Sequence, residues 1–192
     1  MMFRTDCEHY LGYKPCVKGR LCDGCPDYAP SGISALIIKT AATGDVLRTT
    51  SLLPAMKRTI PGLRIEWLTS PYAAPLLANN PHIKHVIPFD AEAMPSLMPR
   101  TFDMVICLDK EPGPAGMATL LNAHEKRGVL LSAHGTPYPA SAAAERYFSL
   151  GLSDELKFKQ NKDTYHRLIA DALGFQYSGE KPELHLTAAE LQ

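Results

Sequence analysis

From about residue 34 onward, the chain alternates short, continuous apolar runs with segments of helical periodicity. Apolar runs of this length are typical of strands that are buried on both faces of a sheet. The predicted strands cover residues 35–39, 63–69, 85–90, 102–109 and 127–132. The predicted helices or short helical pieces cover residues 44–59, 70–80, 90–98, 113–125, 140–150 and 161–173. This alternation, with short connections, predicts a parallel, doubly wound α/β sheet.

Local signals refine several of these boundaries. Pro54 has no backbone N–H and predicts a kink or a restart inside the 44–59 segment. Ser70 followed by Pro71 is typical of a helix start, and Gly174 of a helix stop. The end of the chain, "EKPELHLTAAELQ", predicts one short strand-like piece followed by polar residues.

Composition mainly argues against certain classes of protein. The 192 residues are 45% apolar and 21% charged, and the formal net charge is zero, as in ordinary globular proteins. This charge balance does not indicate a nucleic-acid-binding protein. No apolar run approaches the length of a membrane span, and the N-terminal residues lack the apolar core of a signal peptide. We therefore expect a cytoplasmic protein. A cytoplasmic protein can also act at a membrane surface.

The junction after the first predicted strand carries an acid, Asp45, directly after Gly44. The loop "TAATGD" has one glycine and is not a dinucleotide-binding fingerprint. Two interpretations of Asp45 stay open on spacing alone. With Thr43 as the helix cap, Asp45 falls in the first helical turn, where the macrodipole favours a carboxylate. Ligands of doubly wound sheets also bind beyond the carboxyl ends of the strands, so Asp45 is a candidate general base in a cleft.

The motifs around this junction resemble one enzyme family. The stretches "ALIIKTAATGDVLRTTSLLPAMKRTIPGLRIEWLT" and "APLLANNPHIKHVIPFD", and more loosely "FDMVICLD" and "NKDTYHRLIADALGF", are similar to the acceptor-side half of the ADP-heptose:lipopolysaccharide heptosyltransferases. In that family a first strand runs into Lys or Arg, small residues, Gly-Asp-Val/Ile and a Leu-Pro helix. This ordered set of motifs is more specific than the Gly-Asp pair alone.

The resemblance implies two facing Rossmann-like domains, the GT-B fold, and an inverting transfer of a sugar from a nucleotide-sugar such as ADP-heptose. It implies a lipopolysaccharide-core or related glycan as acceptor, at the inner face of the inner membrane, and no catalytic metal. The family's Gly-Asp aspartate is its catalytic base and corresponds to Asp45. Lys39, Thr43, Gly44 and Arg48 fall in the matching loop and helix start and are the candidate substrate-binding residues.

Two departures from the family follow from the residues present. Many relatives have a histidine where this chain has Arg48, which would alter contacts to the acceptor. The family's second domain, which binds the donor nucleotide, has no counterpart in these residues. We therefore expect a Rossmann-like domain over 32–186, the start of an interdomain linker over 187–192, and a donor site on a missing half or a partner chain. The 192 residues alone are expected to be inactive.

Residues 1–31 form a separate predicted unit that is rich in cysteine and turns. Cys7, Cys16, Cys22 and Cys25 have the spacing C-x8-C-x5-C-x2-C. In a reducing compartment such clustering favours a metal site over disulfides, and four thiolates suit structural zinc or, alternatively, an iron–sulfur cluster. Cys107 lies inside a predicted strand and is interpreted as a buried structural thiol.

The sequence thus predicts a heptosyltransferase-like glycosyltransferase half with an N-terminal metal knuckle. Two alternatives come from other classes of protein. One is a non-catalytic, metal-stabilised module that binds a glycan or a protein. The other is an iron–sulfur redox protein on an α/β scaffold.

Overall fold

The computed structural model describes residues 2–191, and the chain divides into two compact units, residues 1–33 and 34–192. In the first unit, the described residues 2–33 have turns and one isolated bridge, Cys7 to Pro30, in place of regular strands or helices. A hydrogen bond of 2.5 Å from the Tyr28 hydroxyl to Asp6 and an ion pair of 2.9 Å between Arg20 and Asp27 fasten these turns.

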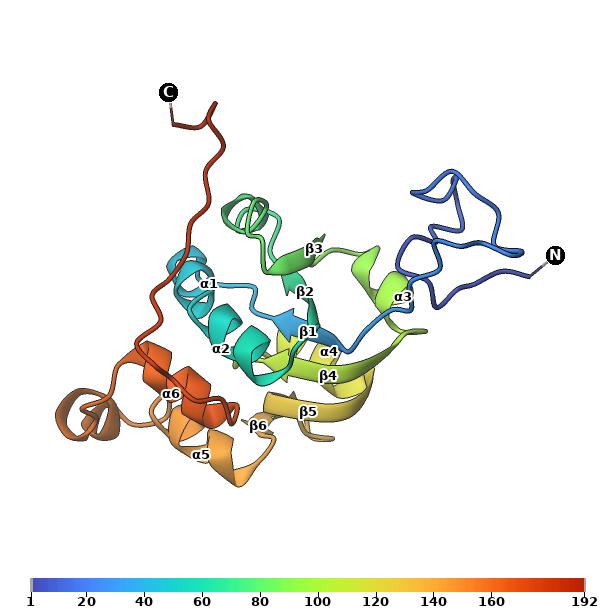
Figure 1. Ribbon diagram of the computed structural model, residues 1–192. Coiled ribbons are helices and arrows are strands. Elements are labelled where there is room, and N and C mark those ends of the chain that lie inside the picture. The colour runs from blue at the N-terminus through green and yellow to red at the C-terminus, as the bar shows by residue number, and fades with distance from the viewer. Residues whose placement is uncertain (1, 192) are drawn as a thin grey trace. The chain divides into compact units, whose positions relative to one another are not determined.

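The second unit is built on a six-stranded sheet in the order β3-β2-β1-β4-β5-β6 (Figure 1). The strands are β1 (Ser34–Ile38), β2 (Arg64–Thr69), β3 (Ile83–Pro88), β4 (Thr101–Cys107), β5 (Asn122–Leu131) and β6 (Pro137–Pro139). The first five strands pair in parallel, and β6 pairs with β5 in antiparallel fashion. The predicted α/β architecture is confirmed, with a short antiparallel edge that the sequence pattern did not predict.

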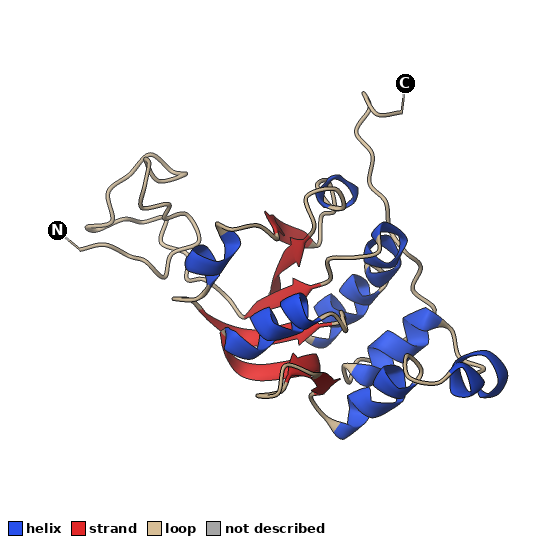
Figure 2. Ribbon diagram, turned by 180° about the vertical axis from the view of Figure 1, so that it is seen from behind, coloured by secondary structure: helices blue, strands red, loops and turns tan. Residues whose placement is uncertain are grey.

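Helices cover both faces of the sheet (Figure 2). They are α1 (Thr43–Thr49), α2 (Leu52–Thr59), α3 (Ala93–Leu97), α4 (Pro112–Leu120), α5 (Ala142–Ser149) and α6 (Tyr165–Ala172), with the short segments η1 (Ala74–Leu76) and η2 (Glu155–Gln160). One core cluster joins the sheet to α1, α2 and α6, and the other joins it to α3 and α4.

The alternation of β1 explains why its whole run is apolar. Ala35 and Ile37 point into the first cluster, and Leu36 and Ile38 point into the second. All four side chains are fully buried because neighbouring strands and helices enclose them on both faces. Burial of each larger aliphatic side chain contributes roughly 1.5–3 kcal/mol, so this strand is a central anchor of the fold.

The predicted 44–59 helix is interrupted at Thr50 and Ser51. Their hydroxyls donate to the carbonyls of Leu47 and Arg48, at 2.7 and 2.9 Å, and the chain restarts at Leu52. Pro54 consequently lies in the first turn of α2, where a missing N–H costs little. The restart predicted from Pro54 is therefore confirmed.

Three other predictions were wrong in extent. The helix predicted over 113–125 ends at Leu120, and residues 124–127, interpreted as a helix end, belong to β5 because they pair with β4. The helix predicted over 70–80 is reduced to η1, since the residue before Pro75 is disfavoured in the helical conformation. The strand-like piece expected near the end is absent between residues 176 and 191.

The segment after α6 instead crosses the first two helices. The backbone N–H of Glu183 donates to the Thr50 hydroxyl at 2.7 Å, and Arg58 forms an ion pair of 2.6 Å with Glu180. Within the part of the chain that the structure describes, residues 2–191, no helix is both long and apolar enough to cross a membrane.

Candidate active site

The candidate site lies where the strand order reverses. From β1 the chain moves to β2 and β3 on one side, and β4 and β5 lie on the other side of β1. The carboxyl ends of β1 and β4 therefore flank the switch point, where doubly wound sheets bind ligands. Lys39 to Ala42 connect the end of β1 to α1 at this point.

Asp45 lies in the first turn of α1, with its backbone N–H donating to the carbonyl of Ala42 at 2.8 Å. Ala42, and not the predicted Thr43, is the residue that precedes the helix, and no side chain caps it. Thr43 and Gly44 are exposed beside it, and a Cβ at Gly44 would meet no atom within 4 Å. The Asp45 side chain is 39% exposed, so a ligand can reach its carboxylate.

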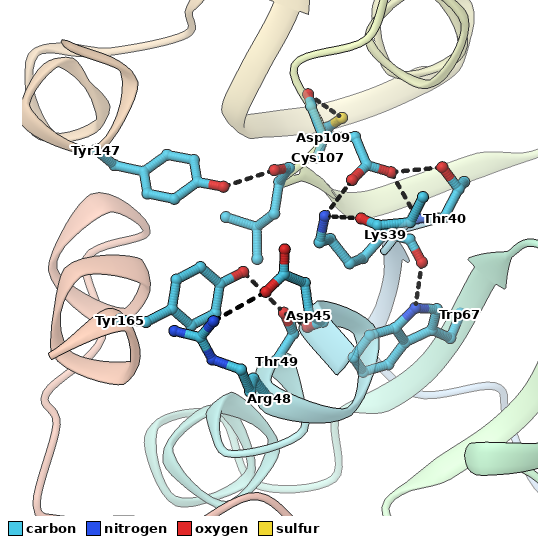
Figure 3. Close-up of polar contacts among 12 residues, drawn as sticks. Lys39, Thr40, Asp45, Arg48, Thr49, Trp67, Cys107, Asp109, Tyr147 and Tyr165 are labelled. Atoms are coloured by element: carbon cyan, nitrogen blue, oxygen red, sulfur yellow. Dashed lines mark hydrogen bonds and ion pairs between the residues drawn. The ribbon is translucent and has the colours of Figure 1, made fainter. Parts of the chain in front are cut away.

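Arg48 joins Asp45 to α6 (Figure 3). Its guanidinium donates to the Asp45 carboxylate at 3.0 Å, and it lies over the ring of Tyr165 at 4.2 Å from the ring centre. The Thr49 hydroxyl donates to the Asp45 carbonyl at 2.7 Å and lies 3.1 Å from the Tyr165 hydroxyl. These contacts hold Arg48 in one orientation and leave the second carboxylate oxygen of Asp45 available.

An open cleft of about 470 Å³ lies over these residues. Its lining includes Asp45, Arg48, Lys110, Tyr147, Lys157 and Tyr165. The cleft therefore combines the carboxylates of Asp45 and Asp163 with cations and aromatic rings. Aromatic faces with nearby hydrogen-bonding groups are surfaces on which a sugar ring can pack.

Lys110 is the cation most affected by this environment. Burial and the neighbouring ammonium of Lys157 lower the pKa of Lys110 to about 8. Its ammonium donates to the carbonyls of Tyr147 and Phe148, at 3.0 and 2.9 Å, at the end of α5. A cation at a helix carboxyl terminus is favourable, so these bonds hold Lys110 at the edge of the cleft.

Lys39 does not reach into the cleft. It is buried, and its ammonium donates to the Asp109 carboxylate at 2.5 Å and to the carbonyl of Ala41. Burial alone would lower the pKa of Lys39, but the charge and the hydrogen bond of Asp109 outweigh it and raise that pKa. The structure thus places Lys39 behind the candidate site as part of an internal ion pair.

Sequence reasoning missed Asp109, Lys110, Tyr147 and Tyr165 as parts of this region. A signal existed for the first two, because they directly follow a predicted strand that neighbours the first one. No local pattern marked the two tyrosines. They come from α5 and α6, and only the packing of those helices against α1 and β4 brings them to the cleft.

The four clustered cysteines line one small cavity of the first unit, together with His9. Even so, residues 2–191 contain no group of three His, Cys, Asp or Glu side chains placed to hold a metal ion. The predicted metal knuckle is therefore not shown: the turns bring the four cysteines to one cavity without forming a ligand cage. Cys107 is fully buried in β4, and burial raises the pKa of its thiol to about 12, as expected of an inert structural thiol.

Comparison with solved structures identifies the architecture. The E. coli heptosyltransferase WaaC with ADP matches with a TM-score of 0.54 and 17% identity over 79% of this chain. WaaC with ADP-2-deoxy-2-fluoro heptose matches with a TM-score of 0.51 and 21% identity, again over 79% of this chain. The fold of this chain is similar to that of about half of the heptosyltransferase WaaC.

The structural similarity covers only part of the WaaC chains. The chain spans 50–51% of the length of the two WaaC structures. The E. coli ADP-heptose lps heptosyltransferase II also matches, with a TM-score of 0.47 and 17% identity over 82% of this chain. No protein-family model and no curated protein matches the sequence. At these identities the comparison establishes the fold of this chain.

Proposed function

We propose that this chain is the acceptor-side half of a heptosyltransferase-like glycosyltransferase. The observation that carries the proposal is the Asp45 carboxylate, which faces an open cleft at the switch point of a heptosyltransferase-like sheet. The acceptor would be a glycan of the lipopolysaccharide-core type, and the donor a nucleotide-sugar such as ADP-heptose. This sugar transfer would take place in the cytoplasm, at the inner face of the inner membrane.

In the proposed reaction, Asp45 takes the proton from an acceptor hydroxyl as that oxygen attacks the anomeric carbon of the donor. The bond from that carbon to the nucleotide diphosphate breaks, the electron pair leaves with the phosphate, and the configuration inverts. Arg48 would orient the carboxylate through its 3.0 Å contact. Tyr147 and Tyr165 would offer ring surfaces to the acceptor sugar.

The donor site would lie mainly on a second half, supplied by further residues or by a partner chain. The proposal is supported by the length comparison, since the matched WaaC structures, one with ADP and one with an ADP-heptose analogue, are about twice as long as the matched region. Lys39, Thr43, Gly44 and Arg48 remain proposed contributors to substrate binding, Lys39 indirectly through the connection to α1.

The test is sugar transfer by the full-length protein, with ADP-heptose as donor and a lipopolysaccharide inner-core acceptor as probe. A general base contributes typically 10²–10⁴-fold, so Asp45→Asn is expected to lower kcat by about 10²-fold or more. Asp171→Asn, on the exposed side of α6, is the matched control and should retain full turnover. Undiminished turnover of Asp45→Asn would overturn the assignment. Binding of the acceptor without transfer by the native protein would favour the non-catalytic module.

We also propose that the cysteine unit binds zinc, with Cys7, Cys16, Cys22 and Cys25 as ligands. Support comes from their shared cavity and from the preference of thiolates for this metal. Metal analysis of protein purified without added metal tests the idea. One zinc per chain and no visible absorption supports it, a brown protein containing iron supports a cluster, and a metal-free folded protein contradicts both.

A further inference from the structure

Strands β1 and β4 are fastened at both ends by the same arrangement. At one end, the Asp103 carboxylate accepts from the backbone N–H and the hydroxyl of Ser34, at 2.8 and 3.0 Å. At the other end, the Asp109 carboxylate accepts from the backbone N–H and the hydroxyl of Thr40, at 2.5 and 2.7 Å. Both pairs are separated by 69 residues, so the second arrangement repeats the first at the far end of the same two strands.

The two ends differ in burial and in charge. Asp103 is exposed, whereas Asp109 is only 1% exposed and also accepts from the ammonium of Lys39 at 2.5 Å. Lys39 in turn donates to the carbonyl of Ala41. The three donors to Asp109 therefore all come from Lys39 and Thr40, the two residues that follow β1 (Figure 3). The Lys39 ammonium also holds the next residue, Ala41, through its carbonyl.

Neighbouring elements hold the same two chain segments. The indole N–H of Trp67 in β2 donates to the carbonyl of Lys39 at 3.2 Å. The Tyr147 hydroxyl of α5 donates to the carbonyl of Leu108 at 2.7 Å, directly before Asp109. Both the carboxylate and the connection that it binds are thus fixed from outside.

We propose that Asp109 is a positioning residue that fixes the connection from Lys39 to Ala42 and thereby sets the place of the Asp45 carboxylate. The connection leads directly into α1, and the Asp45 N–H bonds to Ala42 at its end. A buried ion pair is a weak source of net stability, because desolvation offsets its attraction, so a role in fixing one geometry is the better explanation for it. This inference rests on the proposed role of Asp45 as the base.

The first test needs no turnover. In Asp109→Asn, the carboxylate that binds Thr40 and Lys39 is replaced by an amide, and a buried ammonium loses its counter-charge. Hydrogen–deuterium exchange of the amides of Thr40 and Asp45 is expected to accelerate by about tenfold or more, as local opening becomes easier. Asp103→Asn is the matched control, since it removes the same type of contact from the opposite end and should accelerate exchange at Ser34 only.

A milder pair of variants covers the case in which Asp109→Asn does not fold. Thr40→Val keeps the shape and the backbone N–H but removes the hydroxyl donor, and Thr40→Ser restores it. Faster exchange at Asp45 in Thr40→Val, with recovery in Thr40→Ser, is expected. Unchanged exchange at Asp45 in the folded members of these variants, or equal acceleration in Asp103→Asn, would overturn the positioning role.

The second test separates this inference from the proposed function. In the full-length protein with ADP-heptose and the inner-core acceptor, Thr40→Val is expected to lower kcat by roughly tenfold with both KM values within about twofold, because a misplaced base weakens the chemical step and not binding. Thr40→Ser should recover most of the rate. Absence of transfer by the native protein would remove the proposed function, while the exchange measurements would still decide whether Asp109 fixes the connection.

Discussion

The hydroxyl groups of Thr49 and Tyr165 lie 3.1 Å apart although 116 residues separate them in the chain. The Thr49 hydroxyl donates its proton to the Asp45 carbonyl, so the Tyr165 hydroxyl is the donor in this pair. The contact ties α6 to the helix that carries Asp45. It also places the Tyr165 ring under the guanidinium of Arg48.

Removal of the Tyr165 hydroxyl is expected to weaken this tie. Tyr165→Phe keeps the ring beneath Arg48 and deletes one partly buried hydrogen bond, and such a bond contributes about 0.5–1.5 kcal/mol. The unfolding free energy from chemical denaturation should fall by that amount. Tyr138→Phe, on the exposed side of β6, is the control and should change little. Equal stability of the two variants would mean that the contact contributes nothing measurable.

The lowered pKa of Lys110 predicts a pH dependence of stability. The native pKa is about 8 and the ordinary value is 10.5, so between these pH values the unfolded chain holds a proton that the native chain has released. Lys110 should therefore contribute a rise in the unfolding free energy across that window. Lys110→Met should lack this rise when denaturation is followed at pH 7, 8, 9 and 10. Lys84→Met, at an exposed position of β3, should keep it.

Cys107 is expected to resist alkylation in the folded protein. Its thiol is fully buried with a pKa of about 12, so very little thiolate forms at pH 8. Treatment of chelator-washed protein with iodoacetamide, followed by mass spectrometry, should find adducts at Cys7, Cys16, Cys22 and Cys25 only. Denaturant should add the fifth adduct. Labelling of native Cys107 at the rate of the other four would contradict its burial.

Gly128 is expected to tolerate no side chain. It has φ of 91°, and an added Cβ would overlap the backbone carbonyl of Cys107 on the neighbouring strand. Gly128→Ala should therefore destabilise the chain by roughly 4 kcal/mol or more, which is exceptional for one substitution. Gly135 has φ of 76° with open space around it, so Gly135→Ala isolates the conformational cost of about 1–2 kcal/mol. Similar denaturation midpoints for the two variants would show that β5 can shift away from Cys107.

Much of the fold was predictable because its signals are local. The run around Ile37 is apolar on both faces, and such a run indicates a strand wherever its neighbours lie. The ends of elements were less predictable. The boundary between α4 and β5 depends on pairing with β4, and the sequence around His124 contains no sign of that pairing.

The position of Asp45 was determined by the sequence itself, because the order of a strand, a short loop and a helix places it beyond the carboxyl end of β1 in any doubly wound sheet. Its surroundings were decided only by tertiary structure. Asp109 meets Thr40 across 69 residues and Tyr165 meets Thr49 across 116, and both distances result from strand register and helix packing. Periodicity and local motifs describe what each segment buries, whereas these contacts depend on which segments are buried against one another.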